Sequence, residues 1–266
     1  MRLTGRRVRP TVRWSIRVEG SGAPADRHEV QFVSLRARAV CLQCESRLPP
    51  RTEAWWDEEA RVALCSEPLS GFAGFLAMLL AKARKETGLA VITELLSENH
   101  AEMVAEYADI LQIGARNAQN FQLLIAAAKT GKPVLLKRGL SMKIEEWLLA
   151  GEYVLANENP NLMFCERGIR TFETYTRNTL DLSTIPIIKH ESHCPIVIDP
   201  SQGAGRADLV ATMCKGAVAM GADALLIEVH PNPAEAWSDG SQQVTLDGFA
   251  KLMKELKPFI AAAGRE

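Results

Sequence analysis

The sequence has no long hydrophobic run, no excess of either charge and no glycine-rich nucleotide-binding motif. No apolar stretch approaches the roughly 18 residues that a membrane-spanning helix requires. The formal net charge is −1, so the summed charge does not indicate a nucleic acid or an anionic membrane as a partner. No Gly-x-Gly-x-x-Gly follows any apolar run, which argues against a dinucleotide-binding Rossmann fold.

The six cysteines also lack the spacing of a disulfide framework. Three of them lie in apolar or helical surroundings, which fits buried free thiols and predicts a reducing, cytoplasmic compartment. Cys41 and Cys44 form the one spaced pair, and Cys65 with His28 would complete a zinc site poorly. The Arg-rich residues 1–17 contain no apolar core of a secretory signal, so we expect an unstructured basic arm there.

From residue 72 onward, short apolar runs alternate with helical patterns. The runs are continuously apolar, which is typical of strands buried on both faces. Strict alternation of strand and helix indicates a parallel sheet, and the sequence predicts an α/β fold, a (β/α)8 TIM barrel. Its strands one and two would have to come from the poorly patterned N-terminal stretch, where the barrel pattern is incomplete. The predicted strands cover residues 89–93, 109–114, 133–136, 162–165 and 195–198 and a run that begins at 225.

We predict a boundary near residue 70. Residues 1–70 form an atypical segment in which local signals disagree, although residues 28–42 alternate as a strand would. Residues 71–266 form the barrel domain, in which helix starts are marked by hydroxyl side chains. The predicted N-caps are Ser97, Ser141 and Thr245.

Each predicted strand is followed by polar residues. In a barrel these C-terminal strand ends converge on one rim, where catalysis takes place. Cations after three successive strands repel one another unless an anion joins them, and guanidinium and ammonium groups suit phosphate and carboxylate. The alternative is that acids and bases merely neutralise each other around the rim. The residues are Glu94, Arg116, Lys137 with Arg138, Glu166 with Arg167, Asp199, and Glu228 with His230.

Residues 225–240 (LLIEVHPNPAEAWSDG) combine a buried strand with an acidic loop. Two prolines stop regular structure after His230. Glu228 and Asp239 are oxygen donors that suit a divalent metal. The alternative is that Glu228 caps a helix and that Asp239 opens a turn.

Several of these segments, in fixed order, resemble 3-deoxy-D-arabino-heptulosonate 7-phosphate (DAHP) synthase of type I, in the superfamily shared with Kdo-8-phosphate synthase. The likeness extends over roughly residues 76–258, and several motifs in order are more specific than any single one. The segments are 113–117 (IGARN), 135–139 (LLKRG), 165–171 (CERGIRT), 171–181 (TFETYTRNTLD), 199–201 (DPS), 228–233 (EVHPNP) and 238–240 (SDG).

The resemblance implies a barrel that condenses phosphoenolpyruvate with erythrose 4-phosphate and water to give DAHP and phosphate. This is the first step of the shikimate pathway and of aromatic amino-acid biosynthesis. The resemblance implies that Arg116, Lys137 and Arg167 bind phosphoenolpyruvate, and we add Arg138 and Glu94 to the substrate site. Lys137 and Arg116 are the expected catalytic residues, and a homo-oligomer is expected.

The resemblance also implies a divalent metal ion of the Mn, Fe, Co or Zn type, which would act as a Lewis acid on the aldehyde oxygen. Glu228 and Asp239 match two of the four metal ligands of the family. Gln202 stands where the family has a histidine, and its amide oxygen is a weaker ligand for transition metals than imidazole. The fourth ligand of the family is a cysteine after the first strand, and its nearest match is the segment 41–46 (CLQCES), in which Cys41 or Cys44 could serve. The alternative is that these are unrelated thiols.

The likeness ends abruptly upstream of about residue 70. The second-strand motif of the family, which carries cations for both substrates, is not found. A frameshifted or rearranged start joined to an intact barrel would produce such a boundary. Two interpretations follow. In the first, the protein is an enzyme, either of the DAHP synthase kind or a Kdo-8-phosphate synthase-like relative that uses another aldose phosphate. In the second, it is a catalytically impaired remnant that binds phosphoenolpyruvate or pairs with an intact subunit.

Overall fold

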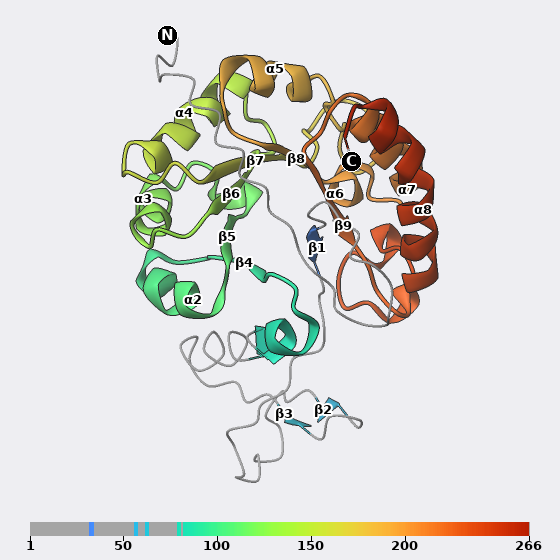
Figure 1. Cartoon of the computed structure of the whole chain (residues 1–266), viewed down its shortest axis with the longest axis horizontal. Helices are drawn as coiled ribbons and strands as arrows, with labels where there is room; N and C mark the ends of the chain where they lie inside the picture. The colour runs from blue at the N-terminus through green and yellow to red at the C-terminus, as the bar shows by residue number, and fades with distance from the viewer. Residues whose placement is uncertain (1–31, 35–55, 58–61, 64–78, 81, 266) are drawn as a thin grey trace.

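A curled sheet of parallel strands forms the centre of the molecule (Figure 1). The computed structural model describes residues 32–34, 56–57, 62–63, 79–80 and 82–265. Six strands follow one another along the chain, and each pairs in parallel with the next. They are β4 (Ile92–Glu94), β5 (Ile110–Ile113), β6 (Val134–Lys137), β7 (Leu162–Glu166), β8 (Ile196–Ile198) and β9 (Ala224–Glu228).

Strand β1 (Phe32–Ser34) pairs in parallel with the free edge of β9, so the sheet runs in the order β1-β9-β8-β7-β6-β5-β4. This arrangement is a partial (β/α)8 barrel and confirms the predicted fold. The stretch predicted as a strand, residues 28–42, contains β1, and Cys41 lies outside the described residues. The described residues of the N-terminal stretch supply no second strand to the barrel sheet. Two short strands, β2 (Trp56–Asp57) and β3 (Val62–Ala63), form a separate antiparallel pair.

Helices cover the outer face of the sheet, one after most strands (Figure 1). The short α6 (Pro200–Ala204) differs, because it lies at the C-terminal end of β8 and packs against β9. No helix within the described ranges is long and apolar enough to cross a membrane. The outer helices are α2 (Ala101–Tyr107), α3 (Phe121–Lys129), α4 (Ile144–Leu155), α5 (Thr184–Glu191), α7 (Ala207–Ala219) and α8 (Leu246–Ala262).

The helix starts confirm two of the three predicted caps. The Ser97 hydroxyl accepts a hydrogen bond from the backbone N–H of Asn99 at the start of a 3-10 turn that leads into α2, and Thr245 caps α8. The prediction for Ser141 is wrong, because α4 begins at Ile144. There the Glu146 carboxylate accepts the backbone N–H of Lys143, which satisfies the helix start without a hydroxyl cap. Helix α5 was not predicted.

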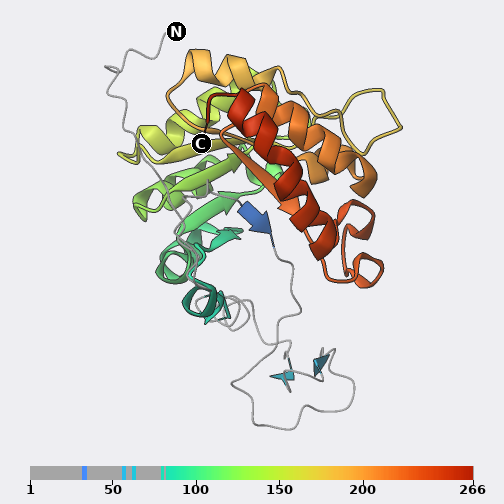
Figure 2. The same cartoon turned by 45° about the vertical axis from the view of Figure 1, so that its right-hand side comes forward.

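The two faces of each strand have different surroundings. Alternate residues such as Val134, Leu136 and Phe164 pack outward against the helices in the main hydrophobic core. The residues between them point into the barrel and form a second buried cluster of strand side chains, Leu135, Cys165, Val197 and Leu226. Two residues further along each of these strands, the inward face becomes polar, and the loops after β7 and β9 lie at this same end (Figure 2). The candidate site therefore rests on a buried apolar layer.

Candidate active site

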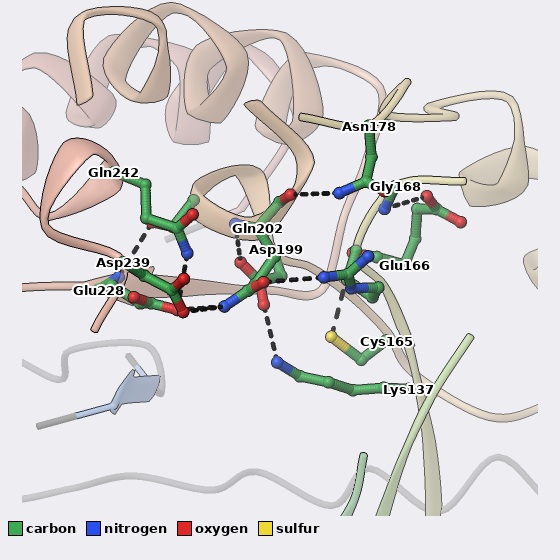
Figure 3. A network of polar contacts seen from close by, with 12 residues as sticks. Lys137, Cys165, Glu166, Gly168, Asn178, Asp199, Gln202, Glu228, Asp239 and Gln242 are labelled. Carbon is green, nitrogen blue, oxygen red and sulfur yellow. Dashed lines mark hydrogen bonds and ion pairs between the residues drawn. The ribbon is translucent and has the colours of Figure 1, made fainter. Parts of the chain in front are cut away.

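Lys137 and Asp199 form a buried ion pair at the polar end of the barrel (Figure 3). Lys137 is the last residue of β6, and Asp199 follows β8, so their side chains meet across the inward face of β7. Nζ of Lys137 lies 2.8 Å from Oδ2 of Asp199. Burial opposes the positive charge, but the Asp199 carboxylate outweighs this effect and the pKa of Lys137 lies above its usual value. The amine is therefore a fixed positive charge at neutral pH.

Arg167 follows β7 and is also buried, with 7% of its surface exposed. Its Nη2 donates to the Gln202 side-chain oxygen at 2.8 Å. Its Nη1 is the one buried side-chain nitrogen or oxygen within the described residues that has no hydrogen-bond partner. Burial lowers the pKa of Arg167, and the Asp199 carboxylate offsets part of this change. An arginine remains charged in proteins, so Arg167 presents a buried cationic donor with unused capacity.

The Gln202 side chain lies between Arg167 and two carboxylates. Its Oε1 accepts from Arg167, while its Nε2 lies 2.5 Å from Oε1 of Glu228 and 3.4 Å from Oδ2 of Asp239. A guanidinium only donates and an ionised carboxylate only accepts, so the neighbours fix which end of the amide is which. The NH2 group of Gln202 faces the acids, and its oxygen faces away from them.

Glu228 ends β9 and is buried, with 4% of its surface exposed. Besides Gln202, the amide of Gln242 donates to its Oε1 at 3.0 Å and the amide of Gln243 to its Oε2 at 2.8 Å. Asp239 lies in the loop beyond β9 in a left-handed conformation, with φ of 55°. Its Oδ1 accepts from Arg177, which belongs to the loop after β7, at 2.9 Å. This pair ties the loops of two strands together.

Arg138 lies outside this network, because it is next to Lys137 and so points to the opposite face of the sheet. Its Nη1 lies 2.9 Å from carboxylate oxygens of both Glu166 and Asp181, and its Nε donates to the Met142 carbonyl. Glu166 is fully buried and also accepts the backbone N–H of Gly168 at 2.7 Å. The predicted substrate residue Arg138 is thus engaged behind the strand, where it supports the Arg167–Gly168 turn.

Glu94 and Arg116 lie at the ends of the neighbouring strands. Glu94 is the last residue of β4, and its carboxylate lies against Gly114, where a Cβ would overlap it. Arg116 follows β5, is exposed, and has no side-chain hydrogen bond or ion pair among the described residues. Arg116 therefore follows the strand next to β6, the strand that ends in Lys137.

The described residues do not fit a transition-metal site. Among them, no group of three or more His, Cys, Asp and Glu side chains is arranged to hold a metal ion. Gln202 would have to turn its oxygen toward the carboxylates, which would place its NH2 group against the guanidinium of Arg167. Cys41, the fourth predicted ligand, lies outside the described residues. A site with these four ligands stays a prediction.

Sequence reasoning gave no role to Asp199 and did not single out Arg177, Gln242 or Gln243, which also belong to the network. Asp199 was noted only as a polar strand end, although its place two residues after the inward Val197 predicts an inward side chain. Gln242 and Gln243 have no comparable signal, because they lie in a loop that periodicity does not describe. His230 accepts the backbone N–H of Asn232 through Nδ1, so it takes part in the structure of this loop.

The curled parallel sheet, with its helices outside and its polar side chains gathered at the C-terminal strand ends, places the protein in the class of α/β-barrel proteins, whose functional sites lie at those ends. The profile of the DAHP synthetase I family matches residues 73–262, and the chain belongs to this family. Metal dependence is general in the DAHP synthase family.

The similarity to individual proteins is high over the same region. The chain is 52% identical over 185 residues to phospho-2-dehydro-3-deoxyheptonate aldolase of Thermotoga maritima, a match that covers 70% of this chain. It is 35% identical over 186 residues to 2-dehydro-3-deoxyphosphooctonate aldolase of Caulobacter vibrioides, which covers 65% of this chain. A solved truncated form of 3-deoxy-D-arabino-heptulosonate 7-phosphate synthase from Thermotoga maritima superposes with a TM-score of 0.70 at 50% identity, covering 71% of this chain and 72% of that one.

The chain matches only part of its curated relatives. The matched regions span 55% of the Thermotoga protein and 63% of the Caulobacter protein. The family and the barrel fold therefore follow from the comparisons.

Proposed function

We propose that the protein is a 3-deoxy-7-phosphoheptulonate synthase, a transferase that condenses phosphoenolpyruvate with erythrose 4-phosphate and water to give DAHP and phosphate. This reaction opens the shikimate pathway toward the aromatic amino acids. The name of the Thermotoga relative and the family match both support this assignment.

One observation carries the proposal: Nη1 of Arg167 is buried without a hydrogen-bond partner among the described side chains. A buried guanidinium nitrogen without a partner has a high desolvation cost, which an anionic oxygen would offset. Lys137 supplies a second buried cation from the neighbouring strand, and Arg116 an exposed one. Phosphoenolpyruvate offers a phosphate and a carboxylate, which together match such a set of cations.

In this proposal the residues of the chain bind and orient the substrates. Arg167 and Lys137 hold phosphoenolpyruvate above the apolar layer formed by Leu135 and Cys165, while Arg116 closes over it from the rim. C3 of the enol attacks the aldehyde carbon, water adds at C2, and the C–O bond to phosphate breaks. Positioning and charge neutralisation are the contributions of the three cations. Glu94 completes the predicted substrate site.

Other predictions belong to the same proposal. A divalent metal of the Mn, Fe, Co or Zn type is expected from the family, but the described side chains give it no support, and no step above depends on it. The boundary between residues 1–70 and the barrel domain is supported by the start of the family match at residue 73. A homo-oligomer and a cytoplasmic location are proposed, the latter supported by the free thiols of Cys165, Cys194 and Cys214.

The test is an assay of the purified full chain for phosphate release from phosphoenolpyruvate, with and without erythrose 4-phosphate, in EDTA and in Mn²⁺. We expect phosphate release that requires the aldose phosphate and is lost in Lys137→Met. Lys129→Met is the matched control, because Lys129 is exposed at the end of α3. Release that persists without erythrose 4-phosphate would contradict the proposed condensation.

Two other functions are the alternatives, and a different observation favours each. A non-catalytic chain that binds phosphoenolpyruvate is favoured by the Gln202 geometry, and it predicts saturable binding without phosphate release. A relative that makes an eight-carbon product is favoured by the 35% identity to the octonate aldolase of Caulobacter. Its aldehyde would have five carbons, so the assay includes D-arabinose 5-phosphate, and preference for that sugar would overturn the heptulonate assignment.

A further inference from the structure

The acidic pair Glu228 and Asp239 is bridged by an amide. Nε2 of Gln202 lies 2.5 Å from Oε1 of Glu228 and 3.4 Å from Oδ2 of Asp239, so one NH2 group contacts both carboxylates (Figure 3). This is the position that a cation shared by the two carboxylates would take. We propose that the amide nitrogen of Gln202 replaces a divalent cation here, and that this chain holds Glu228 and Asp239 together without a metal ion.

Hydrogen bonds hold both the backbone and the side-chain amide of Gln202 in place. Its side-chain oxygen accepts from Arg167 at 2.8 Å. Its backbone N–H donates to Oδ1 of Asp199 at 2.9 Å, and its backbone carbonyl accepts from Nδ2 of Asn178 at 2.9 Å. Turning the amide over would set NH2 against guanidinium and oxygen against carboxylate, two contacts without a hydrogen bond. The amide therefore cannot become an oxygen ligand without breaking the bond to Arg167.

The carboxylates are also committed to other donors. Gln242 and Gln243 donate to the two oxygens of Glu228, at 3.0 and 2.8 Å, and Arg177 donates to Asp239 at 2.9 Å. A metal ion would have to displace the Gln202 nitrogen and compete with these donors. Neutral amides stabilise a buried carboxylate through hydrogen bonds, and the amides of Gln202, Gln242 and Gln243 together offset part of the cost of burying Glu228.

The experiment measures metal binding directly and does not depend on the proposed activity. The EDTA-treated full chain is titrated with Mn²⁺, and free Mn²⁺ is measured by electron paramagnetic resonance. We expect the wild-type chain to show no binding that depends on Glu228. Gln202→His and Gln202→Glu place a metal-binding group between the acids and should raise Mn²⁺ affinity by roughly tenfold or more. Gln122→His adds an imidazole on the exposed side of α3 and is the matched control.

Two results would overturn the proposal. One is a single Mn²⁺ equivalent bound by the wild type and lost in Glu228→Gln. The other is a pair of folded Gln202 variants that bind Mn²⁺ no more tightly than Gln122→His. If neither Gln202 variant folds, the side-chain amide of Gln202 in the wild type decides by NMR. An amide signal that Mn²⁺ leaves sharp supports the proposal, and a signal that Mn²⁺ broadens at one equivalent contradicts it.

Discussion

Lys137 reaches across the inward face of β7 to within 2.8 Å of Asp199, so the residues that end β6 and follow β8 are joined inside the barrel. The strand between them contributes Cys165, whose thiol is buried beside the pair and has its pKa raised by that burial. The ammonium group is thereby held in a fixed position next to Arg167. Two cations so close together are stable because Asp199 lies beside both.

Asp199→Asn tests how Lys137 is kept charged. Without the carboxylate, burial and the charge of Arg167 both act to lower the pKa of Lys137, and we expect that pKa to fall below its usual value. We expect phosphoenolpyruvate affinity to decrease by roughly tenfold to a hundredfold, as for loss of a charge-assisted hydrogen bond. The decrease should grow as the pH rises, because an amine with a lowered pKa loses its proton earlier than the paired amine of the wild type. Calorimetric titration with phosphoenolpyruvate at several pH values measures both effects.

Asp223→Asn is the control for this change. Asp223 forms ion pairs with Lys189 at 2.8 Å and with Arg265 at 2.7 Å, and it directly precedes β9, so it lies at the opposite end of that strand from Glu228. This variant also loses an ion pair, but its phosphoenolpyruvate affinity should keep the pH profile of the wild type. Equal profiles for Asp199→Asn and the wild type would show that the pair does not govern the charge of Lys137.

The Arg138–Glu166 pair predicts a stability effect behind the sheet. Arg138→Met leaves the fully buried Glu166 without its cation, which should lower the free energy of unfolding by about 3–5 kcal/mol at neutral pH. Burial raises the pKa of Glu166, and without Arg138 that pKa rises further. The folded state then binds a proton that the unfolded state releases above about pH 4.5, so the variant loses stability as the pH rises.

Urea unfolding at pH 5 and at pH 7.5 measures this dependence. The difference between Arg138→Met and the wild type should be smaller at the lower pH. The double variant Arg138→Met/Glu166→Gln removes the buried charge and should regain part of the loss at neutral pH. A double variant as unstable as the single one at both pH values would contradict an electrostatic cause.

The sequence was sufficient to predict the order of strands β4 to β9 in the barrel, but not the hydrogen-bond network at their C-terminal ends. Continuous apolar runs separated by helical patterns predicted each strand from β4 to β9, because buried parallel strands need no polar face. Helix α5 was missed because its apolar signal is short: Ile185 and Ile188 are buried, while Pro186 between them reads as a helix breaker. Proline is tolerated there because it lies in the first turn.

For the candidate site, the alternation of side chains along a strand could have predicted that Lys137 and Arg138 face opposite sides of the sheet. Leu135 and Lys137 share one face of β6, and Leu136 and Arg138 share the other, so only one of the two cations points into the barrel. The orientation of Gln202 could not be predicted, since it depends on Arg167 and Glu228, which are distant in sequence. Local patterns carry no information about such contacts.

The cysteines predict a pattern of chemical reactivity. Burial raises the pKa of Cys194 to about 11 and that of Cys214 to about 12, so both remain protonated thiols at pH 8. Together with the buried Cys165 they should resist a disulfide reagent in the native chain and react after denaturation. Peptide mass spectrometry identifies the modified residues. Rapid labelling of Cys214 at pH 8 under native conditions would contradict the packing of α7 against α8.

The buried thiol of Cys194 also affects the stability of the fold at alkaline pH. Between pH 9 and about 11 the unfolded chain ionises Cys194 while the folded chain keeps it protonated, so stability falls as the pH rises through this range. Cys194→Ala removes this contribution and should flatten the decline, which thermal unfolding between pH 8 and pH 10.5 would detect. An unchanged slope in the variant would mean that Cys194 is not protected in the folded state.

Gly168→Ala tests the turn that carries Arg167. Gly168 has φ of +90°, and a Cβ there would lie 2.6 Å from Cβ of Asn178 and 3.0 Å from Cα of Gly203. The left-handed conformation costs about 1–2 kcal/mol for alanine, and the overlap adds about 1–3 kcal/mol. Gly131 provides the matched control, because it has φ of +71° but a Cβ added there would have no atom within 4 Å, so Gly131→Ala should show the conformational cost alone. We expect urea unfolding to rank Gly168→Ala as the less stable of the two variants.

Calorimetry should find weaker phosphoenolpyruvate binding in Gly168→Ala alone. The reason is that Asn178, which the new methyl group would displace, binds Gln202, and Gln202 in turn binds Arg167. Equal stability and equal affinity in the two variants would show that the turn does not position Arg167.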